Sequence, residues 1–202
     1  MRLLLASVRV TAVTIGVCVV GYAGTILGVA QALVPVAANG SLVSSPGGGV
    51  IGSRLIAQAF EDPGYFWPRP SAVDYNGAGA GGSNKSPTSA DLTERAEGAI
   101  ARFGATPESP LPPELAAASG GGLDPHISEH AALYQAGRVA SARRLSPSRV
   151  GALVRESAFS PGGALTRDRV VNVLELNLAL DGVSASGARG TVVPAAESRG
   201  AP

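Results

Sequence analysis

The chain has 202 residues, of which 15% are charged, and a formal net charge of +1. Such a balanced and sparse charge provides no basic surface, so we expect no nucleic-acid partner. A membrane span takes roughly 20 to 25 apolar residues, which leaves enough chain for one modest folded domain but not for two. Cys18 is the only cysteine, so no intramolecular disulfide can form and packing must stabilise the domain.

Residues 10–34 form the first predicted element, a transmembrane helix. They are dominated by Val, Ile, Leu, Ala and Gly, and no charged side chain occurs between Arg9 and Arg54. A helix bonds its own backbone groups, as a bilayer core about 30 Å thick requires. Arg2 and Arg9 precede the span and no basic residue follows it closely, which predicts a cytoplasmic N-terminus (1–9) and an extracytoplasmic remainder.

A cleaved signal peptide is the alternative interpretation of this N-terminus. The basic start fits, and Val36-Ala37-Ala38 is an acceptable cleavage site. However, the apolar region of a signal peptide runs for about 7 to 15 residues, and the uncharged segment here is much longer. The length therefore favours a retained single-pass anchor.

Gly21, Gly24 and Gly28 fall at helical spacing on one face of this predicted span. Small residues let a second helix approach closely, and close packing is a common basis of helix association in membranes. Glycine is also simply frequent in membrane helices, which is an equally weighted explanation. We treat the three glycines as a candidate docking face for a membrane partner.

The stretch that follows predicts a linker and then the start of the domain. Residues 35–51 are rich in Gly, Ser and Pro, which is typical of a linker. Ser53 can cap a short helix to about Phe60, ahead of the aromatic run at 65–67. A long irregular stretch from Pro68 to Pro87 follows, and its Gly-rich part must be either flexible or closely docked.

Capping signals then predict several helices and a short strand. Helices are expected over 89–103, for a short turn after Pro113, over 128–144 and over 147–157. A strand is expected near Val170 and then a helix, since Asn172 and Glu175 form a capping pattern. Residues 183–202 are expected to be a disordered tail. The predicted fold is α+β: one N-terminal transmembrane helix followed by a single small extracytoplasmic mixed domain, residues 52–182.

Two motifs suggest chemistry, and the context argues against both. His126, Glu129 and His130 match the H-x-x-E-H zinc pattern. However, Ser128 caps the predicted helix, so His126 would lie before it and not one turn below His130. We therefore expect no metal site.

The Gly-rich run before Lys85 resembles a phosphate-binding loop, but Asn84 and not Gly precedes the lysine and no strand leads into the loop. No Ser, His and Asp set is placed for nucleophilic catalysis. From the chemistry alone we expect no catalytic residue and no tightly bound cofactor.

Ordered fragments along the chain resemble the KdpC family, the C subunit of the bacterial Kdp potassium-transporting P-type ATPase. The matching fragments are Gly52-Ser53, Tyr65-Phe66, Arg69-Pro70-Ser71-Ala72, Tyr75-Asn76, Gly81-Gly82-Ser83-Asn84, Gly122-Leu123-Asp124-Pro125-His126-Ile127-Ser128, Tyr134-Gln135, Arg138-Val139-Ala140, Val171-Asn172-Val173-Leu174 and Leu176-Asn177-Leu178-Ala179-Leu180-Asp181. Gly121 stands where the family usually has Ser, and the part after Asp181 lies outside the pattern. Glu129 and His130 lie outside it too.

The resemblance implies an accessory subunit, non-catalytic by itself, of a high-affinity ATP-driven potassium uptake complex. In that family the A subunit conducts potassium, the B subunit is a P-type ATPase, and a very small F subunit assists. The subunit is described as a catalytic chaperone that raises the ATP affinity of the B subunit. An exported domain cannot touch cytoplasmic ATP, so such an effect would have to be transmitted through membrane helices as a coupling free energy.

A stabilising cap at the outer potassium entrance is the other role that the resemblance allows, and the predicted topology fits it more easily. Candidate docking residues are then the aromatic run Tyr65, Phe66 and Trp67, with Arg69 close behind it. Each also has a structural alternative, which is favoured for any single residue: the aromatic side chains belong to the core, and Arg69 is a salt-bridge partner. The loops at 77–84 and 119–128 are further candidates. A free-standing anchored enzyme or sensor domain is the alternative function.

Overall fold

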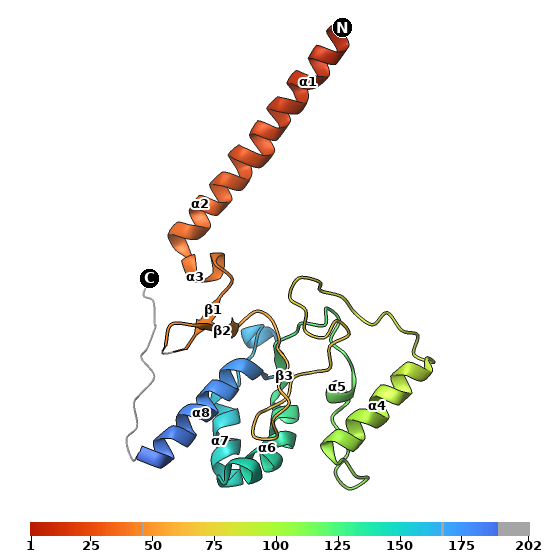
Figure 1. The fold of residues 1–202 in the computed structure, drawn as a ribbon, viewed down its shortest axis with the longest axis vertical. Coiled ribbons are helices and arrows are strands. Elements are labelled where there is room, and N and C mark those ends of the chain that lie inside the picture. The colour runs from red at the N-terminus through yellow and green to blue at the C-terminus, as the bar shows by residue number, and fades with distance from the viewer. Residues whose placement is uncertain (46, 167, 190–202) are drawn as a thin grey trace. The chain divides into compact units, whose positions relative to one another are not determined.

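The computed structural model describes residues 1–45, 47–166 and 168–189, and the chain divides into two compact units (Figure 1). One unit runs from Met1 to Ser53, and the other begins at Arg54. The combination of one long apolar helix with a small domain of helices and short strands confirms the predicted α+β class.

The first unit is dominated by a continuous apolar helix. It consists of α1 (Arg2–Ile15), a π-helical stretch η1 (Gly16–Ala23) and α2 (Gly24–Leu33). Together they form a 32-residue helix that is long and apolar enough to cross a membrane, and none of it is buried within the protein. A surface of this composition needs lipid or other membrane helices around it.

The segment expected to be a linker contains regular structure. A short helix α3 (Pro35–Ala38) precedes strands β1 (Leu42–Ser44) and β2 (Val50–Ser53), which pair antiparallel with a bulge.

The helix expected from Ser53 to Phe60 does not form. The hydroxyl of Ser53 donates to the carbonyl of Gly40 (2.6 Å) instead of capping a helix, and the amide of Ala57 donates to Leu123 O (2.9 Å). These non-local hydrogen bonds replace the helical ones.

Five helices, two strands and one 3₁₀ turn make up the regular structure in the described part of the second unit. In chain order these are α4 (Ala90–Phe103), α5 (Pro113–Ala116), β3 (His126–Ser128), α6 (Glu129–Arg143), α7 (Pro147–Ser157), the 3₁₀ turn η2 (Gly163–Leu165), β4 (Val170–Asn172) and α8 (Val173–Arg189). The predicted helices 89–103, 128–144 and 147–157 and the strand near Val170 are confirmed. Helix α8 reaches Arg189, into the expected tail, whose residues 190–202 lie outside the described residues.

Side-chain caps start α6 and α7 where the sequence predicted them. Ser128 accepts from the amide of Ala131 (3.0 Å), and Ser146 accepts from the amide of Arg149 (3.3 Å). Strand β3, which the sequence did not predict, pairs antiparallel with β4. Its three residues carry too short an alternation to be recognised locally.

The core of the second unit lies where α6, α7 and α8 meet the two short strands. Small and branched side chains on one face of each helix let these elements approach closely. Phe66 comes from the irregular segment before α4 and packs into this core. The buried residues of the main cluster are Phe66, Leu115, Ile127, Ala131, Ala132, Ala136, Val139, Ala140, Val150, Val154, Val171, Val173, Leu176 and Leu180.

Candidate functional site

The aromatic run was a candidate docking surface, and the structure places two of its three residues inside the domain. Phe66 is fully buried and Trp67 is nearly so. Little of either side chain is left exposed to a partner, in agreement with the alternative that these aromatic residues belong to the core. Aromatic side chains carry a large apolar area, so their burial contributes strongly to the core.

Two buried side-chain amides hold this run in an extended conformation. Gln135 on α6 accepts from the amide of Trp67 (2.8 Å) and donates to its carbonyl (3.0 Å). Asn177 on α8 does the same for Phe66, at 2.8 and 3.0 Å. Each side chain therefore replaces the backbone partner that a neighbouring strand would supply. Buried backbone groups need such partners, since an unpaired group costs about as much as a lost hydrogen bond.

Two arginines face the indole ring of Trp67. The guanidinium carbons of Arg138 and Arg102 lie 3.6 and 4.0 Å from the ring centroid, and Phe103 meets the ring edge-on. Arg138 also donates to the carbonyls of Pro63 and Tyr65. Desolvation, and then the charge of Arg102, lower the pKa of Arg138 to about 10, so it remains a cation at neutral pH. The contact is a cation–π interaction that fixes the loop.

Tyr65 is half-buried and occupied by contacts within the domain. Its hydroxyl donates to Asp181 (3.1 Å), and the guanidinium of Arg143 lies over its ring at 4.4 Å. Arg143 in turn forms an ion pair with Asp181 at 2.7 Å. Tyr65 thus joins the irregular segment to α6 and α8, and only part of it remains available to a partner.

Arg69 makes internal contacts as well. Its guanidinium lies 3.5 Å from the carboxylate of Asp124 and 3.4 Å from the carbonyl of Ala118. Asp124 also contacts the imidazole of His126 at 3.4 Å. The hydrogen bond with His126 is the largest cause that lowers the pKa of Asp124, and desolvation opposes it. This cluster joins the loop after Trp67 to the loop before β3.

The two Gly-rich loops dock on one another. The amide of Gly81 donates to the carbonyl of Gly121 (2.9 Å), and the hydroxyl of Ser71 donates to the carbonyl of Gly122 (2.6 Å). Gly122 has φ +69°, and a Cβ there would lie 2.7 Å from a methyl of Val73. Only glycine fits this close approach without strain. Of the two expectations for the Gly-rich stretch, close docking is the one observed.

The residues of the H-x-x-E-H pattern do not converge. His126 lies in β3, whereas Glu129 forms an ion pair with Arg169 (2.9 Å) and His130 is exposed on α6. Among the described residues there is no group of three or more potential ligands that could hold a metal ion.

Lys85, the other residue singled out for chemistry, pairs with Asp91 near the start of α4 at 2.5 Å.

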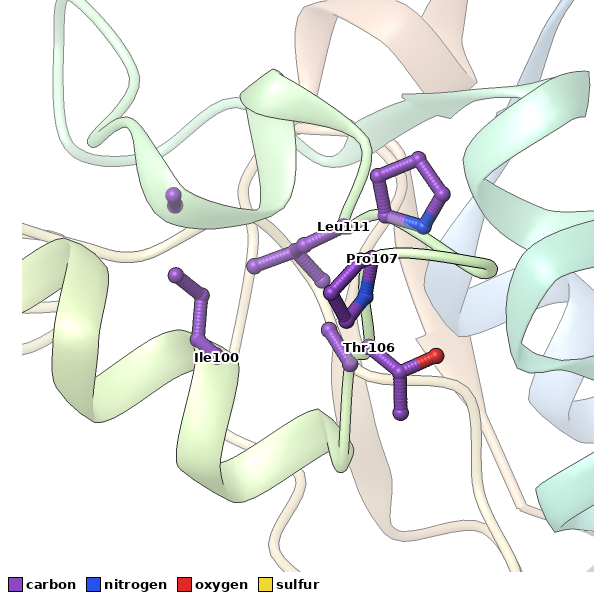
Figure 2. A pocket seen from close by; sticks show the side chains of 7 residues that line it. Ile100, Thr106, Pro107 and Leu111 are labelled. Atoms are coloured by element: carbon purple, nitrogen blue, oxygen red, sulfur yellow. The ribbon is translucent and has the colours of Figure 1, made fainter.

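An apolar pocket lies between α4 and α5 (Figure 2). It has a volume of about 420 Å³, and Thr106 is its only lining residue with a polar side chain. Ile100 is 46% exposed even though it projects from α4 toward Leu111. The residues that line the pocket are Ile100, Ala105, Thr106, Pro107, Pro110, Leu111 and Ala116.

No pattern in the sequence predicts this pocket. The Pro-rich turn between α4 and α5 is its only local signal, and such a turn predicts the end of a helix and not a hollow. Most of the lining residues come from that turn, and Ile100 and Ala116 on the two helices complete the lining. A concave, predominantly apolar surface of this size can accept an apolar side chain or a short apolar segment.

The glycine face of the membrane helix is open. A Cβ at Gly24 or Gly28 would meet nothing within 4 Å, and one at Gly21 would lie 3.5 Å from the carbonyl of Gly16. Gly24 and Gly28 share one face of α2, while Gly21 lies in the π-helical stretch. The hydroxyl of Thr25 is occupied locally by the carbonyl of Gly21 (2.7 Å). Nothing within the described part of the chain covers this face.

These features define the class of protein: a small mixed domain, internally well bonded, carried on a single apolar helix suited to a bilayer. The family model described as "K+-transporting ATPase, c chain" matches residues 4–182. The chain therefore belongs to the KdpC family, and its membrane helix and folded domain both fall within the match.

Similarity to individual proteins agrees with the family match. The chain is 61% identical to the potassium-transporting ATPase KdpC subunit of Parvibaculum lavamentivorans over 93% of its own length and the whole of that relative. It is 46% identical to the subunit of that name from Ralstonia nicotianae, over 79% of this chain and 80% of the relative. For the Cereibacter sphaeroides subunit the identity is 43%, over 82% and 89%.

Proposed function

We propose that the chain is the non-catalytic accessory subunit of a high-affinity, ATP-driven potassium uptake complex. Its membrane helix holds it in the bacterial cytoplasmic membrane, with the N-terminus inside and the domain outside. It assembles there with the potassium-conducting A subunit, the ATP-hydrolysing B subunit and the small F subunit. Family membership carries this proposal, supported by relatives that are named as potassium-transporting ATPase subunits.

Of the two roles open to such a subunit, we propose the stabilising cap on the outer side. Arg2 and Arg9 precede the apolar helix and the next basic residue is Arg54, a distribution that favours export of the domain. An exported domain lies on the other side of the membrane from cytoplasmic ATP. An effect on the ATP affinity of the B subunit would then require coupling through the membrane helices.

The pocket between α4 and α5 is our candidate docking point on the domain, with an apolar side chain of another Kdp subunit as its occupant. In protein–protein interfaces the binding energy concentrates where a side chain fills a pocket from which water is expelled. Phe66 and Trp67 are committed to the core, so the pocket replaces them in this role. On the membrane helix, the face of Gly24 and Gly28 remains the candidate contact with a partner helix.

Copurification from the native membrane tests the assembly. An affinity tag on this chain should recover the other Kdp subunits after detergent extraction, and deletion of the chain should abolish growth at limiting potassium. If the chain is recovered alone and its deletion leaves uptake unchanged, an accessory role in the pump is wrong, and a free-standing anchored enzyme or sensor becomes the better hypothesis.

Two charge substitutions on α4 test the pocket. Ile100→Glu places a charge at the mouth of the pocket, whereas Ala101→Glu adds the same charge to the same helix at an exposed position outside it. We expect Ile100→Glu to reduce recovery of the complex about tenfold, which corresponds to about 1.4 kcal/mol. Ala101→Glu should leave recovery unchanged. Equal recovery for both variants would refute docking at this pocket.

A truncation that keeps the membrane helix and removes the domain distinguishes cap from chaperone. The KM for ATP of the truncated complex should equal that of the complete complex, while the yield of assembled complex should fall. A large rise in KM at unchanged yield would instead support the chaperone role.

A further inference from the structure

The hairpin that follows the membrane helix exposes an apolar face. Leu42 is 55% exposed, Val50 is 60% exposed and Ile51 is 36% exposed. Leu42 and Ser44 lie two residues apart on β1, and Val50 is the direct partner of Ser44. Because opposed residues share a face and alternate residues return to it, Leu42 and Val50 project to the same side of the hairpin.

The hairpin is attached to the end of the helix by polar contacts within the same unit. The side-chain amides of Gln31 and Asn39 form a reciprocal pair at 3.2 and 3.1 Å, and Asn39 also donates to the carbonyl of Pro35 (2.7 Å). At the open end of the hairpin, next to this helix end, Ser53 donates to the carbonyl of Gly40. The side chains of Gln31, Asn39 and Ser53 are therefore hydrogen-bonded within this junction, as a site with little water requires.

The helix length places this junction at the edge of the bilayer. At about 1.5 Å per residue, residues 10–33 extend for roughly 35 Å, slightly more than a hydrocarbon core of about 30 Å. The charge-free stretch does not end with the helix, because no charged residue occurs before Arg54. The whole hairpin thus lacks the charges that would draw it into water.

Backbone hydrogen bonding limits how deep the hairpin can lie. Within the described part of the chain the hairpin has only two strands, so each strand keeps one edge without a partner strand there. Unpaired backbone groups are excluded from hydrocarbon but are satisfied by water and headgroups at the interface. An exposed apolar face with open polar edges therefore fits the boundary between acyl chains and headgroups, and not the core.

We propose that the β1–β2 hairpin lies in the interfacial layer of the membrane, with Leu42 and Val50 in contact with lipid acyl chains near the glycerol backbone. Its partner is the bilayer itself. The proposal depends on the membrane span being retained, and it adds a second, shallow membrane contact that restrains the chain where it leaves the bilayer.

Fluorescence quenching by lipids that carry a nitroxide tests this placement. A Cys18→Ala background removes the only native thiol. Single cysteines are then introduced as Val50→Cys in the hairpin, Val20→Cys in the middle of the span, and Glu108→Cys on the exposed turn before α5. Each is labelled with an environment-sensitive fluorophore, and both the full-length chain and the assembled complex are reconstituted into nanodiscs.

We expect the label at Val50→Cys to be quenched several-fold more by a nitroxide near the glycerol backbone than by one near the end of the acyl chain. Val20→Cys should show the reverse order, and Glu108→Cys should be quenched weakly by both. If Val50→Cys behaves like Glu108→Cys, the interfacial placement is wrong. If it is shielded from lipid only in the assembled complex, a partner subunit and not lipid covers the face, which also refutes the proposal.

The Val20→Cys label separates this proposal from the proposed span. A failure of deep quenching at Val20→Cys would refute the membrane span itself. Normal deep quenching there, together with no quenching at Val50→Cys, would refute only the interfacial hairpin.

Discussion

Replacing Gln135 by leucine should strongly destabilise the domain, although the two side chains have similar sizes. Gln135 is 1% exposed and bonds to both backbone groups of Trp67 and to the guanidinium of Arg138 (2.8 Å). Leucine can make none of these hydrogen bonds. The substitution therefore leaves the amide and the carbonyl of Trp67 buried without this partner.

The size of the effect follows from these two backbone groups. Each buried group that loses its partner costs about 1–3 kcal/mol, so the pair costs about 2–6 kcal/mol. The apolar leucine side chain offsets about 1–2 kcal/mol of this through burial. We expect a net loss of about 3 kcal/mol in the free energy of unfolding, or a fall in Tm of roughly 6–12 °C for a chain of this size.

Trp67 provides the assay, because it is the only tryptophan in the chain and contacts Gln135 directly. Urea unfolding of the full-length chain in detergent, followed by Trp67 fluorescence, gives the midpoint and the slope. Gln58→Leu is the matched control: Gln58 is only partly buried, and its side chain forms no hydrogen bond in the described structure. Its effect should stay within about 0.5 kcal/mol. If Gln135→Leu costs no more than this control, the amide does not support the aromatic run.

Further predictions concern a glycine pair, a carboxylate, a helix cap and the membrane helix. Gly122→Ala should cost more than about 1 kcal/mol, because φ is positive there and the added Cβ would lie 2.7 Å from a methyl of Val73. By contrast, Gly137→Ala, in an open position on α6, should stabilise the domain by about 1 kcal/mol. Because folding lowers the pKa of Asp124, its contribution is present above the unfolded pKa of about 3.9 and is lost as pH falls through the folded pKa. The free energy of unfolding of Asp124→Asn should therefore fall less steeply than that of the wild type as the pH is lowered below about 5. Ser146→Ala should cost about 1 kcal/mol through loss of the α7 cap. Gly24→Leu combined with Gly28→Leu should lower the yield of assembled complex without affecting membrane insertion.

Each of these predictions has a direct measurement. Thermal unfolding by circular dichroism ranks the two glycine variants, and equal shifts in Tm would refute the steric explanation for the loop. Unfolding titrations across acidic pH test Asp124. If Asp124→Asn shows the same pH dependence of the free energy of unfolding as the wild type, this carboxylate does not contribute to stability. If Ser146→Ala leaves the Tm unchanged, the prediction for the α7 cap is wrong. Copurification tests the glycine face, and normal recovery of the complex with the double variant would leave the helix as an anchor only.

Local signals in the sequence were enough for most of the helices. Ser128 and Ser146 mark the starts of α6 and α7, and both cap through their side chains as expected. The absence of charge over residues 10–34 identified the apolar helix from composition alone. These features depend on interactions between residues close together in the chain, so a sequence pattern contains them.

Non-local contacts account for what the sequence analysis missed. Ser53 could cap a helix, but it ends β2, its hydroxyl donates to the carbonyl of Gly40, and the residues up to Phe60 form no helix. The aromatic run was open to two interpretations, a docking surface or core, and the amides of Gln135 and Asn177 hold it as a core segment. Neither outcome can be deduced from local propensity, because the deciding partner lies on a distant part of the chain.

Charge, apolar composition and capping residues act locally, so the order of amino acids was enough to predict one uncharged apolar helix and one small α+β domain. The same sequence contains the ordered fragments that identify the KdpC family. The folded structure settles which conspicuous residues stay exposed. It buries Phe66 and Trp67 and joins the Gly-rich loops to each other, while it leaves an apolar pocket beside Ile100, because side chains far apart in sequence compete for the same buried space.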